Sequence, residues 1–170
     1  MSLKITVRRA GDQDLSALWA LVDKLGYGKD AGYFEYCLEL QKEGKREIYI
    51  LAKDGIDAGY GILNWQPKYA LFKKLGIPEI QDLNILQKFR QQGLASHLIG
   101  FCEQRAIEEG HKEMGIAFGL HSSYGPAQRL YVKLGYIPDG QGATYDRKQI
   151  AHGEFKPVDD DLCLMLVKGL

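Results

Sequence analysis

Short stretches of the chain alternate between apolar and polar residues, a period of two that is typical of β-strands with one face buried. Asp54-Gly55 separates two such stretches and is typical of the tight turn of a hairpin. The pattern predicts strands at residues 5–9, 46–53, 58–65, 79–85 and 114–118, a strand that begins at 136–138, and a last one at 162–167.

Between these stretches, apolar residues recur three and four positions apart, the spacing of amphipathic helices. It predicts helices at about 15–25, 31–42, 93–109 and 126–134, a helical turn within 67–76, and a long loop over 139–161. Because the helix at 93–109 lies between two strands, we expect a parallel crossover there. The sequence therefore predicts an α/β fold, a central mixed sheet with helices on both faces, in a single domain over residues 1–170.

Composition narrows the function classes. Lys plus Arg and Asp plus Glu are both 22, which gives a net charge of zero and argues against a nucleic-acid partner. No apolar run is long enough for a membrane span, and the N-terminal residues lack the pattern of a signal peptide. Three cysteines without a Cys-x-x-Cys pair and four scattered histidines predict no metal site and no disulfide. We therefore expect a cytoplasmic protein without a metal or membrane partner.

The segment that leads into the helix at 93–109 is suited to anion binding. The first turn of a helix presents unpaired N–H groups and partial positive charge. Helix starts usually carry Asp or Glu, yet residues 84–102 contain no acidic residue and include Lys88 and Arg90. Gly93 and the small Ala95 leave room for a ligand at the backbone, so this start suits a phosphate or pyrophosphate, although an ordinary connecting turn has the same features.

Two motifs here resemble signatures of the GCN5-related N-acetyltransferases. Arg90-x-x-Gly93-x-Ala95 is similar to the acetyl-coenzyme A signature, and residues 127–136 (Ala-Gln-Arg-Leu-Tyr-Val-Lys-Leu-Gly-Tyr) are similar to the second signature. The predicted order of strands and helices also matches the family. The resemblance implies that acetyl-coenzyme A is the co-substrate, with its pyrophosphate on the backbone of the loop at Arg90, Gln91, Gln92, Gly93, Leu94, Ala95 and Ser96.

The resemblance also implies where the rest of the co-substrate lies. Its pantetheine arm would pair along Leu83, Asn84 and Ile85, and the N–H of Ile85 would polarise the thioester carbonyl. The sequence departs from the family at Tyr124, where many members have an asparagine that bonds the pantetheine. Ser123 is a candidate replacement.

Acid–base residues are expected because an alkylamine, with a pKa near ~10.4, must lose a proton before it attacks. Tyr131 occupies the tyrosine of the second signature and is the candidate acid, although its spacing also fits a core aromatic. Glu79 stands where one branch of the family has its base, and Asp82 is the rival. Strand alternation would place Glu79 and Gln81 on one face and Asp82 on the other, unless a bulge intervenes. Either carboxylate could instead be structural.

The resulting hypothesis is transfer of an acetyl group from acetyl-coenzyme A to an amine of a small molecule or peptide, by direct attack in a ternary complex. The alternative is a non-catalytic acyl-coenzyme A sensor on the same fold. The resemblance further implies that residues 26–34 line the acceptor side and that the protein could be a homodimer, as is common in the family.

Overall fold

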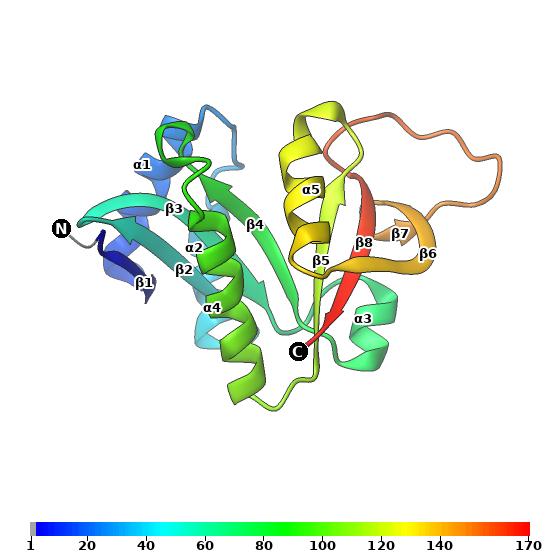
Figure 1. The fold of residues 1–170 in the computed structure, drawn as a ribbon, viewed down its shortest axis with the longest axis horizontal. Coiled ribbons are helices and arrows are strands. Elements are labelled where there is room, and N and C mark those ends of the chain that lie inside the picture. Colours follow the sequence, from blue (N-terminus) through cyan, green and yellow to red (C-terminus); the bar gives the residue numbers. More distant parts are fainter. Residues whose placement is uncertain (1–2) are drawn as a thin grey trace. The chain divides into compact units, whose positions relative to one another are not determined.

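The computed structural model describes residues 3–170 and divides the chain into two compact units. The first unit comprises the chain up to Trp65 together with Ile80–Gln104, and the second comprises Gln66–Glu79 and Arg105–Leu170. Figure 1 labels the helices and strands of the two units. The single domain expected over residues 1–170 stays a prediction.

The first unit contains a sheet with the strand order β1-β2-β3-β4. Strand β1 pairs antiparallel with β2, and β2 pairs antiparallel with β3 through the predicted turn at Asp54-Gly55. Around these strands lie two 3₁₀ turns and three α-helices. The bounds are β1 (Ile5–Arg9), η1 (Asp12–Asp14), α1 (Leu15–Leu25), α2 (Tyr33–Lys42), β2 (Arg46–Lys53), β3 (Ile56–Asn64), β4 (Glu79–Ile85), η2 (Gln87–Phe89) and α4 (Leu94–Glu108), whose ends Glu79 and Arg105–Glu108 belong to the second unit.

Helices α1 and α2 pack on one face of this sheet. Alternate residues of β2 and β3 point toward them, as the period of two predicts. The aromatic ring of Phe34 lies at the centre of this core, in edge contact with Trp19 (5.0 Å) and Tyr60 (5.3 Å). The buried members of the core are Ala10, Leu18, Leu21, Val22, Phe34, Cys37, Leu38, Ile48, Ile50, Tyr60, Ile62 and Leu86.

Helix α4 packs on the opposite face of the same strands. The ring of Phe101 contacts that of Tyr49 at 4.9 Å, and Tyr49 alternates with the core residues of β2. Gly61 faces Leu98, whose side chain would be 3.2 Å from a β-carbon at that position. The prediction of a mixed α/β fold with helices on both faces is thereby confirmed within this unit.

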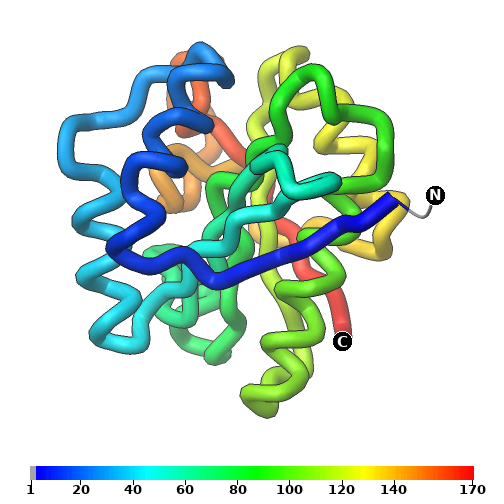
Figure 2. The backbone as a smooth tube through the Cα atoms, turned by 90° about the vertical axis from the view of Figure 1, so that its left-hand side faces the viewer, coloured from blue at the N-terminus to red at the C-terminus, as the bar shows by residue number. Residues whose placement is uncertain are grey.

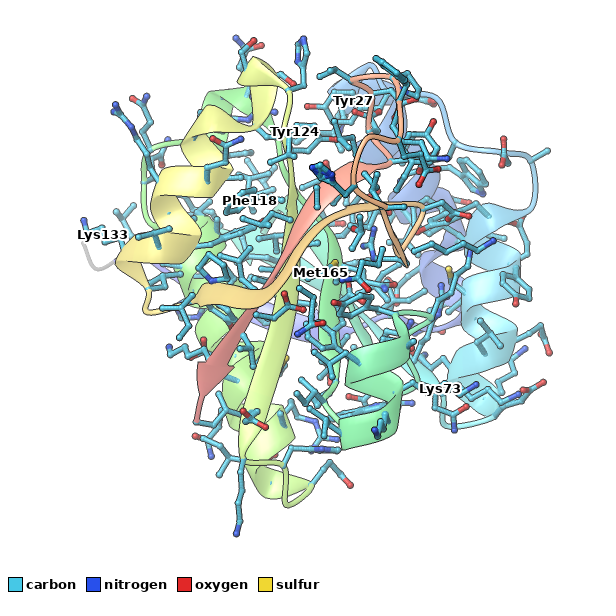
Figure 3. The ribbon with its side chains drawn as sticks, turned by 90° about the vertical axis from the view of Figure 1, so that its right-hand side faces the viewer. Tyr27, Lys73, Phe118, Tyr124, Lys133 and Met165 are labelled. Carbon is cyan, nitrogen blue, oxygen red and sulfur yellow. The ribbon has the colours of Figure 1, made fainter. Side chains whose placement is uncertain are left out.

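The second unit contains strands in the order β5-β8-β6-β7, all antiparallel to their neighbours. Phe72 and Tyr69 pack on one face with Met165, while Phe118 lies 6.5 Å from the ring of Tyr131 on α5. Phe118 and Met165 are labelled in Figure 3. The bounds are α3 (Ala70–Leu75), β5 (Glu113–Gly119), η3 (Ser122–Tyr124), α5 (Gly125–Lys133), β6 (Ile137–Tyr145), β7 (Lys148–Gln149) and β8 (Leu162–Gly169).

The prediction of a long loop over residues 139–161 is partly wrong. Strand β6 continues to Tyr145 and returns as β7, which leaves irregular backbone only after Gln149. The pairing of β6 with β8 is interrupted between Pro138 and Ala143, where Gly140 and Gly142 have φ values of +84° and +77°. This irregularity removes the alternation by which a strand is recognised in sequence.

Candidate functional site

The connection between β4 and α4 has the backbone of an anion-binding loop. Gln91 and Gly93 have positive φ values of 58° and 77°, and Leu94 then begins the helix. The first turn of α4 carries no acidic side chain. A β-carbon on Gly93 would meet no atom within 4 Å, so the loop is open at this point. Its N–H groups and the positive end of the helix are therefore available to an anion.

Arg90, a candidate for cofactor binding, also holds the loop. Its Nε donates to the backbone carbonyl of Ile85 at 3.0 Å, and its Nη2 donates to the hydroxyl of Tyr27 at 3.1 Å. The side chain of Gln92 donates to the carbonyl of Lys88 at 3.1 Å and accepts from Lys53. These contacts fix the loop against the end of β4.

The end of β4 that the resemblance assigns to the pantetheine is anchored to β3. The N–H of Leu86 donates to the carbonyl of Ala58 at 2.8 Å. At Gly59 any β-carbon would collide with the carbonyl oxygen of Asn84, so glycine permits the close approach of the two strands. Leu83, Asn84 and Ile85 are therefore held in a fixed position at the start of the loop.

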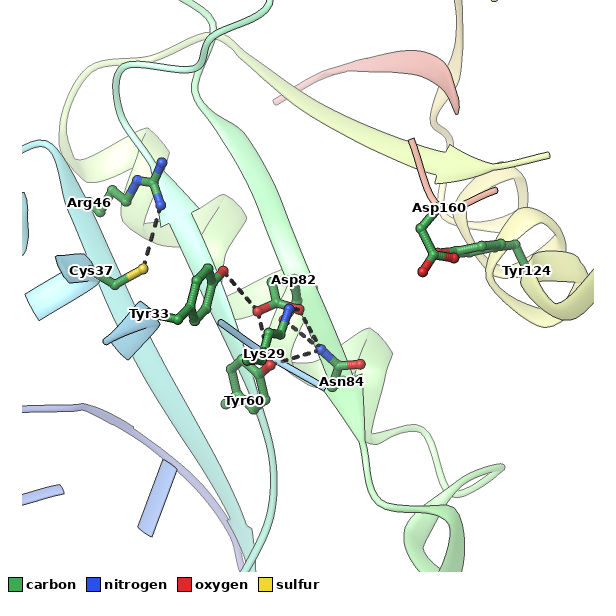
Figure 4. A network of polar contacts seen from close by, with 9 residues as sticks. All are labelled: Lys29, Tyr33, Cys37, Arg46, Tyr60, Asp82, Asn84, Tyr124 and Asp160. Carbon is green, nitrogen blue, oxygen red and sulfur yellow. Dashed lines mark hydrogen bonds and ion pairs between the residues drawn. The ribbon is translucent and has the colours of Figure 1, made fainter. Parts of the chain in front are cut away.

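Asp82 lies at the centre of a polar network in the first unit, shown in Figure 4. Its Oδ1 accepts from the Nζ of Lys29 and the Nδ2 of Asn84, both at 2.8 Å. Its Oδ2 accepts from the hydroxyls of Tyr33 at 3.0 Å and Tyr60 at 2.9 Å. The carboxylate is largely buried, with 14% of the side chain exposed, and is compensated by four donors.

The backbone at Asp82 is unusual, with a φ of +49° inside β4. Gln81 and Asp82 bond to Asn64 and Tyr60, which lie on the same face of β3. Asp82 and Asn84 both bond to Tyr60, as alternation predicts, whereas Gln81 bonds to Asn64 on that same face. Strict alternation is therefore wrong at Gln81, next to the left-handed residue. Positive φ in a non-glycine residue costs free energy and is often found at functional sites.

Burial, the larger cause, and the nearby Asp82 carboxylate raise the pKa of Tyr33 and of Tyr60 well above the ordinary value of a tyrosine. Both phenols therefore stay protonated and remain donors to Asp82 at physiological pH.

Glu79 has a different environment, in the second unit. Its side chain is fully buried, and its Oε1 accepts from the Nε and Nη2 of Arg147 at 3.1 Å and 2.8 Å. Burial lowers the pKa of Arg147, but the neighbouring Glu79 carboxylate outweighs it and the pKa is raised. This ion pair agrees with the alternative that the sequence leaves open, in which Glu79 is a structural, ion-paired carboxylate.

Tyr131 is 7% exposed on α5, between the rings of Phe118 and Tyr136. Burial raises the pKa of its phenol to about 12. Within residues 3–170 its hydroxyl makes no hydrogen bond, and it is not fully enclosed by protein atoms. Tyr131 is thus both a core aromatic and a protonated donor whose hydroxyl remains accessible from outside the protein.

Ser123 and Tyr124 already have partners. The hydroxyl of Ser123 lies 2.9 Å from the Nδ1 of His121, and the hydroxyl of Tyr124 donates to Asp160 at 2.7 Å, as Figure 4 shows. The hypothesis that Ser123 replaces the family's asparagine stays a prediction.

The contacts of four residues with these carboxylates were not predicted from the sequence: Lys29, Tyr33, Tyr60 and Arg147. Each is distant in sequence from its carboxylate, by 22 to 68 residues. A tyrosine at a core position of β3 has the same periodicity as any buried aromatic residue, so only the fold reveals these contacts.

The described residues offer neither a cluster of metal ligands nor a membrane-spanning helix. Residues 3–170 contain no group of three His, Cys, Asp or Glu side chains that could hold a metal ion. Among the same residues, no helix has the length and apolar character needed to span a membrane.

Comparison with solved structures identifies the fold. An acetyltransferase from Salmonella typhimurium that modifies the N-terminal serine of ribosomal protein L7/L12 superposes with a TM-score of 0.74 at 13% identity, over 99% of each chain. A ribosomal-protein-alanine N-acetyltransferase from Brucella melitensis gives 0.69 at 17% identity, over 97% of this chain and 99% of that one. An N-acetyltransferase from Staphylococcus aureus Mu50 gives 0.71 at 12% identity, over 98% of each chain. At these identities the likeness establishes the fold alone.

Comparison with curated proteins found no significant match. The model of the acetyltransferase (GNAT) family, however, matches residues 16–136, well over half of the 170 residues and including both signatures. Since this match and the fold agree, the chain belongs to the GNAT family of acetyltransferases.

Proposed function

We propose that this protein transfers an acetyl group from acetyl-coenzyme A to a primary amine of a small molecule or peptide, by direct attack within a ternary complex. Membership in the family establishes the coarser statement: the protein is an acetyltransferase enzyme that uses an acyl-coenzyme A and acylates an amine. The acetyl group, the order of the steps and the roles of individual residues are parts of the proposal.

The loop before α4 supports binding of the coenzyme A pyrophosphate. Gly93 has a left-handed backbone with open space around it, and the first helical turn lacks acidic side chains. A diphosphate would accept hydrogen bonds from the N–H groups of residues 91–96 and be favoured by the helix dipole. This loop, with the signature that it carries, is the single observation that supports the proposal most strongly.

The state of the cysteines supports direct attack rather than a covalent intermediate. All three are buried. Burial raises the pKa of Cys102 to about 12 and also raises the pKa values of Cys37 and Cys163. Since the thiolate is the nucleophilic form, none of them is activated to take the acetyl group from coenzyme A.

Of the two candidate bases, Asp82 is the better supported. Glu79 is fully buried and ion-paired with Arg147, whereas Asp82 keeps some exposure and is held by donors that orient both oxygens. In the proposed step the amine nitrogen forms a bond to the thioester carbon, the carbon–sulfur bond breaks, and the amine proton passes to Asp82.

Tyr131 is the proposed acid. The departing thiolate would take the proton of its hydroxyl, which is present at physiological pH because the pKa is about 12. The second signature and the unpartnered hydroxyl support this role.

The proposal is tested by mixing the protein with acetyl-coenzyme A and a broad panel of primary amines. Amine-dependent release of the coenzyme A thiol, with the N-acetyl product identified by mass spectrometry, is expected. Coenzyme A binding without thiol release across the panel would instead favour the sensor function.

A further inference from the structure

The four partners of the Asp82 carboxylate differ in how firmly they are held. Tyr60 and Asn84 project from strands, and Tyr33 is the first residue of α2. Lys29, by contrast, comes from the irregular segment between α1 and α2, visible as the blue connection in the backbone trace of Figure 2. Three partners are thus built into the fold and the fourth is carried by a loop.

The Lys29 ammonium lies beside a carboxylate and over an aromatic ring. Its Nζ lies 2.8 Å from Oδ1 of Asp82 and 4.7 Å from the centre of the Tyr33 ring. A carboxylate and an aromatic face together are a usual means of recognising organic ammonium groups. The ion pair is largely shielded, with 22% of the Lys29 side chain and 14% of the Asp82 side chain exposed.

The segment that carries Lys29 has a glycine with left-handed backbone at each end. Gly26 and Gly32 bound the segment with φ values of +73° and +79°, and a β-carbon at either would meet no atom within 4 Å. Such glycines are common at positions where a segment changes direction. Asp82 keeps its own strained backbone, φ +49°, because β4 and its partners hold it.

We propose that Lys29 occupies a subsite for the ammonium group of the acceptor, which displaces Lys29 when it binds against Asp82, Tyr33 and Tyr60. This inference rests on the proposed function and names the substrate class: unhindered primary alkylammonium ions. With a pKa near ~10.4 such amines arrive protonated, so the Asp82 carboxylate recognises the cation. The ammonium loses one proton to solvent before it attacks, and Asp82 receives the second proton as the carbon–nitrogen bond forms.

An internal occupant lowers the apparent affinity for an external one. If Lys29 fills the subsite about 90–99% of the time, its removal raises the affinity for an ammonium ion by roughly 10- to 100-fold. A lysine that only stabilised the fold would leave the affinity unchanged.

The experiment measures binding of n-butylammonium by calorimetry and by its effect on thermal unfolding, without acetyl-coenzyme A. Lys29→Met keeps an unbranched side chain and removes the charge, whereas Lys29→Arg keeps a cation. Lys45→Met is the matched control, because Lys45 pairs with Glu43 at 2.5 Å elsewhere in the same unit. We expect n-butylammonium to bind Lys29→Met at least about tenfold more tightly than the wild type, and to raise its unfolding temperature more. The Lys29→Arg and Lys45→Met variants should bind like the wild type.

Equal affinity of Lys29→Met and the wild type would overturn the inference, as would equally tight binding of neutral n-butanol. Should Lys29→Met fail to fold, titration of the wild type with n-butylammonium is followed through the ¹⁵N resonance of the Lys29 ammonium. That resonance is expected to shift on displacement, and no shift at saturation would also overturn the inference. If one of these results overturned the inference while amines still caused thiol release, the proposed function would remain intact. Ammonium binding without any acetyl transfer would count against the proposed function alone.

Discussion

Glu79 and Arg147 form an ion pair in which one carboxylate oxygen accepts two hydrogen bonds from the guanidinium, at 2.8 Å and 3.1 Å. Glu79 is fully buried and 23% of the Arg147 side chain is exposed. Arg147 reaches this position from a tight turn in which it and Asp146 both have positive φ values, of 63° and 47°. The hairpin β6–β7 therefore presents the arginine that compensates the first residue of β4.

Breaking this pair should destabilise the protein. Arg147→Met removes the guanidinium from beside a buried carboxylate, a change that typically costs about 3–5 kcal/mol. Urea unfolding measures the loss. The matched control is Lys68→Met, because Lys68 forms an exposed ion pair, at 2.8 Å, with Asp146 of the same turn. Loss of this exposed pair should lower the free energy of unfolding by less than about 1 kcal/mol. Similar small losses in both variants would contradict a buried, compensating role for Arg147.

The choice of base predicts different pH–rate profiles for two variants. A base accepts a proton only when deprotonated, so the wild-type rate should fall on the acidic side. Asp82→Asn should remove this acidic limb and lower turnover by about 10²–10⁴-fold. Glu79→Gln should keep the limb and lose mainly stability. Loss of the limb in Glu79→Gln alone would reverse the assignment.

Tyr131→Phe removes the proposed proton donor and preserves the ring that packs on Phe118. Turnover should fall by about 10²–10⁴-fold while coenzyme A affinity stays the same. Because the pKa of Tyr131 is about 12 and an acid must be protonated, its ionisation should cause no loss of rate below about pH 11. The control is Tyr36→Phe, at an exposed tyrosine of α2. Unchanged turnover in Tyr131→Phe, under conditions where chemistry limits the rate, would leave Tyr131 as a packing residue.

Gly93→Val tests the pyrophosphate loop. The matched control is Gly76→Val, since Gly76 has a similar φ of +68° and the same open space around its missing β-carbon. Both variants should lose about 1–2 kcal/mol of stability from left-handed backbone strain. Only Gly93→Val should weaken coenzyme A binding, by at least about tenfold, which calorimetry measures. Equal affinities in the two variants would move the pyrophosphate away from this loop.

The cysteines should be inert in the folded protein. With a pKa of about 12, Cys102 is a thiolate in only about 10⁻⁴ of molecules at pH 8, and burial restricts access to all three. Iodoacetamide should therefore modify them only after unfolding, and pretreatment of the native protein should leave turnover unchanged. Stoichiometric labelling of a native cysteine with loss of activity would reopen a covalent mechanism.

Local sequence patterns predicted most helices and strands because their signals lie within a few residues. Leu15, Leu18 and Val22 repeat at helical spacing, and α1 begins and ends where they indicate, at Leu15 and Leu25. The loop before α4 was found in the same way, from Gly93 and the missing acidic residues.

The features that the sequence did not predict depend on backbone conformations that are unusual for their residue types. The turn of β6–β7 has positive φ at Asp146 and Arg147, where glycine or asparagine would have been a recognisable signal. For the same reason, the sequence does not reveal that Asp82 takes a left-handed conformation inside β4. The contact of Lys29 with Asp82 joins residues 53 positions apart, so it requires the fold.

Amine-dependent thiol release tests the central claim most directly. The wild-type protein is incubated with acetyl-coenzyme A and each member of a panel of primary alkylamines and peptide amines, beside Asp82→Asn and a reaction without amine. The account predicts that at least one amine causes release of the coenzyme A thiol and appears as its N-acetyl product, and that Asp82→Asn loses this activity while still binding coenzyme A. Saturable binding of acetyl-coenzyme A with no amine-dependent release from the wild type across the whole panel would contradict it.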